Sequence, residues 1–320
     1  MSSCSQPPSD DNPVPSLKIT GNYDGCGIGT FIQDGMPNAA IISTYETIIS
    51  REVSVVMWFL DWTYPFPTAT CEIINAHGSV PMITWMPMKW ADGTDETYSL
   101  ENIIAGNCDS YISSFANSAK SWGKPVFLRW GHEMNGNWYN WSGYNNGSNE
   151  AAVAKYKEAW KRIYITFEAL GANNVTWVWC PMNENIPDQP WNYADKYYPG
   201  NDYVDWVAFD GYSRQSNSFK SFDQIFSAIY SSFSSLYNKP IMIGEMSSAT
   251  SEIHNKSSWI TDAFIKLKSS SYSKIKLYIW FNQAKTESDG FCDWRADSLL
   301  AHKISFEAAM SDPYYLSTIH

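Results

Sequence analysis

Short apolar, β-rich runs alternate with helix-like segments along almost the whole 320-residue chain. The sequence predicts eight strands, at Ile19–Asp24, Val53–Trp62, Val80–Pro87, Val126–Glu133, Val175–Pro181, Val204–Tyr212, Pro240–Ser248 and Ile275–Asn282. It predicts helices at Asn38–Ser50, Thr68–Ala76, Asp109–Trp122, Glu150–Leu170, Phe222–Tyr237, Ser257–Lys268 and Ser298–Ala309. Strand–helix alternation sustained eight times predicts an α/β fold, a single (β/α)8 TIM barrel.

The expected domain organisation is simple. Residues 17–320 form the predicted catalytic barrel, since the length suits one large barrel and no internal repeat is seen. Residues 1–16 are rich in Ser, Pro and Asp, and are predicted to be a disordered linker or cloning remnant. No apolar run is long enough for a transmembrane helix, and no charged-then-apolar leader opens the sequence.

The charge balance restricts the partners. With 22 basic and 33 acidic residues the net charge is −11, which disfavours nucleic acid, anionic membranes and polyanionic polysaccharides. Neutral ligands are unaffected. Aromatic residues make up 16% of the chain, and many of its 16 tryptophans fall in predicted loops, where flat rings suit the apolar faces of sugars.

The six cysteines show no CxxC or Cys/His spacing, so no metal site is predicted. They fit free core thiols or one or two disulfides, and the sequence does not choose between these. The cysteines are Cys4, Cys26, Cys71, Cys108, Cys180 and Cys292.

Carboxylates, tryptophans and amides recur where the predicted strands end. In a (β/α)8 barrel the functional site lies at the carboxyl ends of the strands. A set this consistent therefore predicts a site at that rim. Its members include Asp24, Asp61, Trp85, Glu133, Glu184, Asp210, Glu245, Trp280 and Asn282.

Two glutamates carry the predicted chemistry. Glu133 ends the fourth predicted strand and precedes an aromatic turn, and Glu245 follows Gly244 in the apolar seventh strand. The ends of these strands face each other across a barrel mouth. Paired carboxylates are the usual requirement for cleaving a glycosidic bond, because one protonates the leaving oxygen and the other attacks or stabilises the anomeric centre. A structural Arg–Glu pair is the alternative reading of Glu133 alone.

Three segments resemble the signature segments of glycoside hydrolase family 26, in clan A. They are Arg129 to Trp141 (RWGHEMNGNWYNW), Tyr197 to Tyr212 (YYPGNDYVDWVAFDGY) and Pro240 to Ser248 (PIMIGEMSS). The resemblance implies a (β/α)8 barrel and retaining hydrolysis of a β-linked polysaccharide. It implies Glu133 as the acid/base, Glu245 as the nucleophile, and no cofactor.

The resemblance extends to residues beside the pair. His132 matches a histidine beside the acid/base, although a packed core histidine is the alternative. Tyr212 resembles a tyrosine that donates to the nucleophile, which would favour its ionised form. Asp210 could orient substrate, or hold Arg129 or His132 in an ion pair. We expect aromatic sugar contacts from Trp138, Tyr139, Trp280, Trp85 and Trp90.

The stretch after the third strand bears on the substrate. Mannan-cleaving members usually carry a histidine there, whereas Ile83 to Trp90 reads ITWMPMKW. The sequence therefore favours mixed-linkage β-1,3-1,4-glucan over β-1,4-mannan, with β-1,3-xylan as a further candidate. We expect a secreted, extracellular, endo-acting enzyme that works as a monomer. A non-catalytic glycan-binding barrel is the alternative from another class, but two facing glutamates have no obvious role in binding a neutral sugar.

Overall fold

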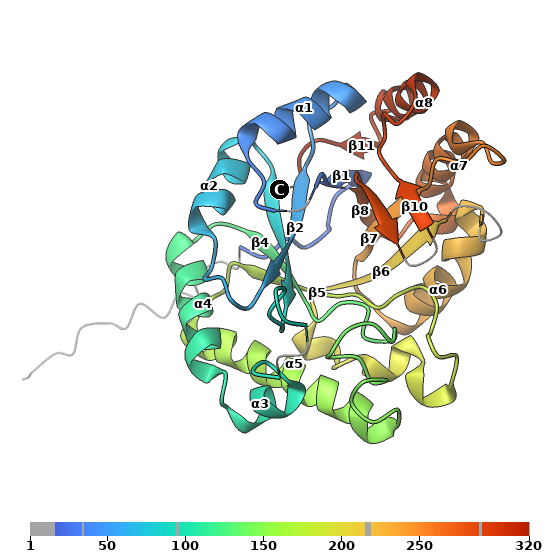
Figure 1. The fold of residues 1–320 in the computed structure, drawn as a ribbon. Helices are drawn as coiled ribbons and strands as arrows, with labels where there is room; N and C mark the ends of the chain where they lie inside the picture. The colour runs from blue at the N-terminus through green and yellow to red at the C-terminus, as the bar shows by residue number, and fades with distance from the viewer. Residues whose placement is uncertain (1–16, 34, 94–95, 215–218, 288–289, 320) are drawn as a thin grey trace, which may run out of the picture.

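Eight parallel strands close into a barrel in this computed structural model, and Figure 1 shows their arrangement. The structure describes residues 17–33, 35–93, 96–214, 219–287 and 290–319. Each strand pairs with its neighbour in chain order, and β1 pairs with β8 to close the ring. The predicted TIM barrel is confirmed, and the predicted linker 1–16 lies outside the described residues. The strands are β1 (Cys26–Phe31), β2 (Val55–Asp61), β3 (Val80–Met86), β4 (Val126–Trp130), β5 (Val175–Trp179), β6 (Trp206–Ser213), β7 (Ile241–Ser248) and β8 (Ile275–Phe281).

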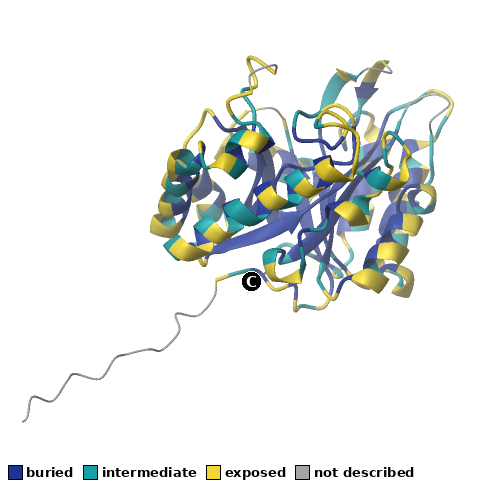
Figure 2. Ribbon diagram, turned by 90° about the horizontal axis from the view of Figure 1, so that it is seen from below, coloured by how far each residue is buried: buried dark blue, intermediate teal, exposed yellow. Residues whose placement is uncertain are grey.

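Helices surround the barrel, with buried strands inside and exposed outer helix faces (Figure 2). For three helices, α2, α4 and α5, the predicted first and last residues are the observed ones. No helix of the described chain is long and apolar enough to span a membrane. The helices are α1 (Ala39–Ile49), α2 (Thr68–Ala76), α3 (Leu100–Ala105), α4 (Asp109–Trp122), α5 (Glu150–Leu170), α6 (Phe222–Leu236), α7 (Lys256–Lys268) and α8 (Leu300–Met310).

The predicted first strand, Ile19–Asp24, is wrong. The strand is Cys26–Phe31 instead. Its glycines interrupt the run of apolar side chains by which a strand is predicted from sequence. A Cβ on Gly29 would lie 2.5 Å from the backbone oxygen of Tyr278, so glycine is what lets β1 approach β8. Ile19 is buried in the same apolar cluster as the barrel interior, and its backbone oxygen accepts from Nε1 of Trp206 at 2.7 Å.

Several elements were not predicted. They are helix α3, the antiparallel hairpin β9 (Ala284–Glu287) with β10 (Gly290–Asp293), and the short strand β11 (Tyr315–Leu316), which pairs with β1. All are short, and short elements carry too few residues for a clear period. The five described cysteines are free and buried, which leaves no disulfide among them.

Apolar side chains form two layers, one inside the barrel and one between the barrel and its helices. Along β8, Leu277, Ile279 and Phe281 belong to the inner cluster, whereas Tyr278 and Trp280 belong to the outer one. This alternation follows from the two-residue period of a strand. It decides which strand residues can reach the mouth of the barrel.

Candidate active site

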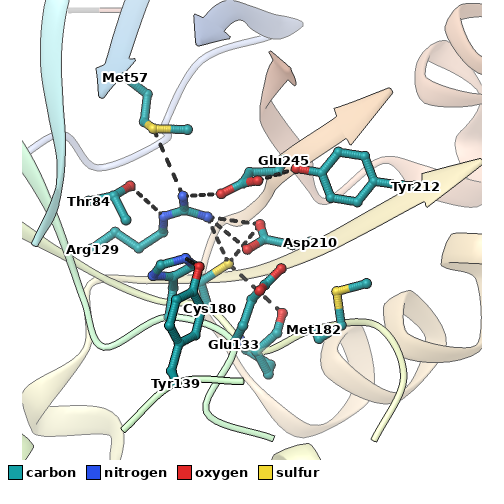
Figure 3. Close-up of polar contacts among 12 residues, drawn as sticks. Met57, Thr84, Arg129, Glu133, Tyr139, Cys180, Met182, Asp210, Tyr212 and Glu245 are labelled. Carbon is teal, nitrogen blue, oxygen red and sulfur yellow. Dashed lines mark hydrogen bonds and ion pairs between the residues drawn. The ribbon is translucent and has the colours of Figure 1, made fainter. Parts of the chain in front are cut away.

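Arg129 is the centre of the site. It lies on β4 at an inward position, is fully buried, and its guanidinium contacts four other strands (Figure 3). Nη1 donates to Oδ1 and Oδ2 of Asp210 at 2.9 and 2.8 Å, Nε donates to Oγ1 of Thr84 at 2.9 Å, and Nη2 donates to Oε1 of Glu245. A buried cation is tolerated only with such partners. Arg129 therefore fixes two carboxylates at the carboxyl end of the barrel.

A β-bulge directs Glu245 into the barrel. Register shifts occur between Phe209 and Asp210 on β6 and between Ile243 and Met246 on β7, so that Asp210 pairs with Glu245. Strict alternation from inward Met242 would turn Glu245 outward. The extra residue is Gly244, and a bulge re-aims the side chain that follows it.

Glycine is required at that bulge. A Cβ on Gly244 would lie 2.5 Å from Oδ1 of Asp210 and 2.8 Å from Sγ of Cys180. The Gly–Glu sequence of β7 thus serves both the ion pair and the direction of the carboxylate.

Tyr212 holds the other oxygen of Glu245. Its hydroxyl donates to Oε2, while Arg129 donates to Oε1. Burial, and then the charge of Glu245, raise the pKa of the Tyr212 phenol well above its ordinary value, so the hydroxyl keeps its proton for this bond. Two donors therefore hold both oxygens of Glu245.

Glu133 lies beyond its strand, not at the strand's end as predicted. β4 ends at Trp130, and Gly131 and Glu133 both have φ of 53°. This left-handed conformation is uncommon for a side chain larger than glycine, and such strain clusters at functional sites. The backbone nitrogen of Glu133 donates to the oxygen of Cys180 at 2.8 Å, which ties the turn to the end of β5.

Glu133 and Glu245 have different environments. Nε1 of Trp138 donates to Oε2 of Glu133 at 2.8 Å. Burial, and then the negative charge of Glu245, raise the pKa of Glu133 to about 7, against the opposing effect of Arg129. A carboxyl group with a raised pKa beside a second carboxyl group held by two donors is the pattern of an acid and a nucleophile.

The carboxylates lie close together. One oxygen each of Glu133, Asp210 and Glu245 can be chosen so that all three lie within 4.8 Å of one another. Three carboxylates at this spacing could also attract a cation, but the Arg129 guanidinium already pairs with two of them. The spacing of Glu133 and Glu245 suits direct attack on a sugar held between them, because an intervening water needs about 6.5–9.5 Å.

His132, expected beside the acid/base, and Asp210, expected to orient substrate or to hold Arg129 or His132, are both buried. His132 packs against Tyr139, whose hydroxyl lies 3.1 Å from its Nε2, and burial and Arg129 keep its pKa well below the ordinary value. Asp210 is fully buried in its pair with Arg129. The alternatives of a packed histidine and a structural ion pair describe their surroundings.

Two of the tryptophans that the sequence predicts as sugar contacts are exposed near the site. Trp138 is 43% exposed and bonded to Glu133, and Trp90 is 59% exposed. Asp61 orders the loop that carries Trp90, since its Oδ2 accepts from the backbone nitrogen of Trp90 at 2.7 Å. Tyr139 is half-buried, with its ring centroid 4.8 Å from that of His132 and 6.3 Å from that of Trp138.

The prediction that Trp85 and Trp280 contact sugar is wrong for this structure. Both indoles are fully buried in the outer layer, Trp85 against Phe115 and Trp280 against Phe306. They lie at outward positions of β3 and β8, so strand alternation turns them toward the helices.

Trp294 is a site residue that sequence reasoning missed. Its ring lies 5.1 Å from that of Tyr212, and its backbone oxygen accepts from Oγ of Ser247 at 2.9 Å. It therefore supports the tyrosine that holds Glu245. Trp294 follows β10 in an irregular segment, where no period marks it.

Comparisons with known proteins identify the family of the chain. A family model described as "Glycosyl hydrolase family 26" matches residues 74–261. "Endoglucanase H" of Acetivibrio thermocellus is 34% identical over 314 residues, covering 93% of this chain and 32% of that protein. A "Mannan endo-1,4-beta-mannosidase" of Bacillus subtilis is 34% identical over 121 residues, covering 37% of this chain and 32% of the relative. The chain thus spans about a third of the length of these relatives.

A solved structure shows the same fold. The "GH26 beta-mannanase from Bacteroides ovatus" superposes with a TM-score of 0.67 and 18% identity, over 92% of this chain and 91% of that chain.

Proposed function

This chain belongs to glycosyl hydrolase family 26, and from that premise we propose that it is a retaining endo-β-glycanase with Glu133 as acid/base and Glu245 as nucleophile. The observation that carries the proposal is the pair itself. One carboxylate is held by two donors, and the other, with its pKa raised to about 7, lies within 4.8 Å of it. That spacing favours double displacement.

In the first step an oxygen of Glu245 bonds to the anomeric carbon as the glycosidic C–O bond breaks. Glu133 gives its proton to the departing oxygen, which leaves as the hydroxyl of the product sugar. The result is a covalent glycosyl–enzyme ester and an ionised Glu133. Arg129 and Tyr212 orient the attacking carboxylate without blocking its role, since each hydrogen bond occupies one lone pair of one oxygen.

In the second step Glu133 acts as a base. It takes a proton from water, the water oxygen bonds to the anomeric carbon, and the bond to Glu245 breaks. Two inversions give overall retention, and both carboxylates return to their starting states. No step requires a metal or cofactor.

The favoured substrate is mixed-linkage β-1,3-1,4-glucan. The relative named an endoglucanase matches 93% of this chain, against 37% for the relative named a mannosidase. The end of β3 and the loop after it carry Trp85, Met86 and Met88 and no histidine; Trp85, which faces the helices, and Met86 are buried. No polar partner for an axial C2 hydroxyl comes from these three side chains.

β-1,4-Mannan is the second candidate, and β-1,3-xylan the third. Solved structures with this fold include mannanases, and one polar side chain from another loop could supply a contact for mannose. A non-catalytic glycan-binding barrel is disfavoured by the buried pair, because keeping two carboxylates together is costly and serves no purpose in binding a neutral sugar. Action outside the cell as a monomer completes the proposal.

A substrate panel tests it. kcat/KM is measured on barley β-glucan, lichenan, β-1,4-mannan and β-1,3-xylan under one condition, from the release of reducing sugars. Glucan turnover that exceeds mannan turnover supports the proposal. A tenfold preference for mannan, about 1.4 kcal/mol of transition-state discrimination, would overturn the substrate and leave the catalytic pair in place.

A further inference from the structure

A hollow of about 550 Å³ lies beside the catalytic acid, on the other side of Trp138. Its wall includes Trp138, Asn145 and Asn146 from the loop after β4, and Ser99 and Glu101 from the start of α3. Its volume falls within the usual 300–1,000 Å³ of small-molecule sites. Nε1 of Trp138 donates to Oε2 of Glu133 at 2.8 Å, so the indole that contacts the proposed acid also lines the hollow.

One face of the Trp138 indole is already covered. A Cβ on Gly136 would lie 2.5 Å from Cζ2 of the indole, so this face rests on the Gly136 backbone. Trp138 nonetheless stays 43% exposed, and it lines the hollow. An exposed indole held rigidly from behind is a suitable platform for the apolar face of a pyranose.

The polar groups of the hollow present acceptors. Nδ2 of Asn146 donates to the backbone oxygens of Asn140 and Ser142, both at 2.7 Å, and Nδ2 of Asn145 donates to that of Tyr139 at 2.8 Å. These bonds fix the amide planes, and Oδ1 of Asn145 and of Asn146 accepts no hydrogen bond from the described residues. Sugar hydroxyls are the donors that such fixed oxygens would receive.

The charged residues around the hollow favour a neutral ligand. Glu101 is ion-paired with Lys155, which lowers its pKa and keeps it ionised at the edge of the hollow. The described residues that line the hollow include no lysine or arginine. The wall therefore offers acceptors for neutral hydroxyls, and its described residues offer no cation that would favour an anionic sugar.

We propose that this hollow is a distal subsite that binds one neutral sugar residue of the polysaccharide, stacked on Trp138 and hydrogen-bonded to Asn145, Asn146 and Glu101. The inference rests on the proposed function, because only a chain that crosses Glu133 and Glu245 would continue into it. It adds a specificity determinant from α3, outside the loops that hold the catalytic pair.

The test compares long and short substrates. Glu101→Ala is assayed on the hexasaccharide of whichever polysaccharide the wild type cleaves, and on an aryl β-disaccharide of the same sugar. We expect kcat/KM to fall about fivefold on the hexasaccharide, as for one partly exposed hydrogen bond to a charged group, and to stay within twofold on the aryl substrate.

Two controls separate the explanations. Lys155→Ala removes the ion pair but keeps the carboxylate, so it should leave the hexasaccharide rate within twofold. Asn117→Ala alters another hollow, lined by Trp122 on the outer face of α4, and should change neither rate. An equal fall on both substrates, an equal fall in Lys155→Ala, or no fall at all would each overturn the subsite. A wild type inactive on every polysaccharide would overturn the proposed function instead.

Discussion

Both carboxylate oxygens of Asp210 lie within 2.9 Å of one nitrogen of Arg129, Nη1, while Nη2 of the same guanidinium donates to Glu245. Asp210 thus binds the half of the guanidinium that Glu245 does not use. The bond to Thr84 fixes the remaining edge, so the guanidinium plane is held from three sides. One arginine therefore sets the position of the proposed nucleophile relative to the barrel.

Replacing Arg129 should cost stability as well as activity. Arg129→Met leaves two buried carboxylates without a cation, and breaking a buried pair by removing one partner typically costs about 3–5 kcal/mol. The free energy of unfolding is measured by urea titration with circular dichroism at pH 7. Arg162→Met is the matched control, because Arg162 pairs with Asp109 at the surface, where a pair contributes about 0–1 kcal/mol. Equal losses in the two variants would contradict the central role of Arg129.

The sequence predicts an element well where the spacing of its apolar residues agrees with the capping residues at its ends. Helix α5 begins after Asn149, whose side chain accepts from the nitrogen of Ala152, and ends at Gly171 with φ of 75°. Both caps are visible as residue types. Strand β1 has the opposite character, because Gly27 and Gly29 remove the apolar side chains that mark a strand.

The sequence predicts which residues lie at the candidate site, but it does not predict the direction in which their side chains point. Strands of a parallel barrel are apolar on both faces, so the sequence does not tell which set points inward. Trp280 and Trp85 were misjudged for that reason. Glu245 shows the reverse, since only the bulge at Gly244 turns it inward, and a bulge depends on pairing between distant strands.

Gly244→Ala should damage both the fold and the reaction. The added methyl group would lie 2.5 Å from Oδ1 of Asp210 and 3.1 Å from Nη1 of Arg129, and overpacking of this kind costs about 1–3 kcal/mol. We expect kcat to fall as well, because the following residue is Glu245. Thermal unfolding and kcat are measured together.

Gly93→Ala is the control for the unfolding measurement, since a Cβ there meets nothing within 4 Å and its φ is not left-handed. Its unfolding free energy should change by no more than about 0.5 kcal/mol. A wild-type melting curve for Gly244→Ala would show that the barrel relaxes around the methyl group.

The pH dependence of activity should report Glu133. The acid form is the active one, so kcat/KM should fall above a pKa of about 7, by roughly tenfold per pH unit well beyond it. The Trp138 hydrogen bond lowers this pKa, so Trp138→Phe should shift the alkaline limb to higher pH. Rates are measured on an aryl glycoside whose own ionisation lies outside the range. An unchanged limb in Trp138→Phe would refute the link between the indole and the acid.

The free energy of unfolding should also depend on pH through the carboxyl group of Glu133, and the direction of this dependence can be predicted. Its pKa is raised from 4.5 to about 7 on folding, so the folded protein binds more protons than the unfolded chain between these values. This contribution is therefore present below pH 4.5 and is lost as pH rises to about 7. Glu133→Gln lacks it, so its unfolding free energy relative to wild type should rise across that window, by at most about 3 kcal/mol. A constant difference between the two proteins would show that Glu133 titrates normally.

Removing either glutamate of the pair should abolish most hydrolysis and leave the fold intact. Glu245→Ala loses the attacking oxygen. Glu133→Ala loses the proton donor, which typically contributes a factor of about 10²–10⁴ to the rate. Glu184→Ala is the matched control, since this carboxylate follows β5 at the same rim but pairs with Lys220 at the surface. It should keep the wild-type rate within twofold on an aryl glycoside, with circular dichroism confirming all three folds.

Azide then distinguishes the two roles. With a dinitrophenyl leaving group, which needs no protonation, Glu133→Ala still forms the glycosyl–enzyme ester but lacks the base that activates water. Azide needs no base, so it should attack the anomeric carbon, displace Glu245, and restore turnover with a β-glycosyl azide as product. In Glu245→Ala no such ester forms, and azide in the nucleophile's place would give the α-glycosyl azide instead. Product anomers are read by NMR. A β-azide from Glu245→Ala, or wild-type turnover by that variant without azide, would reverse or refute the assignment of the two glutamates.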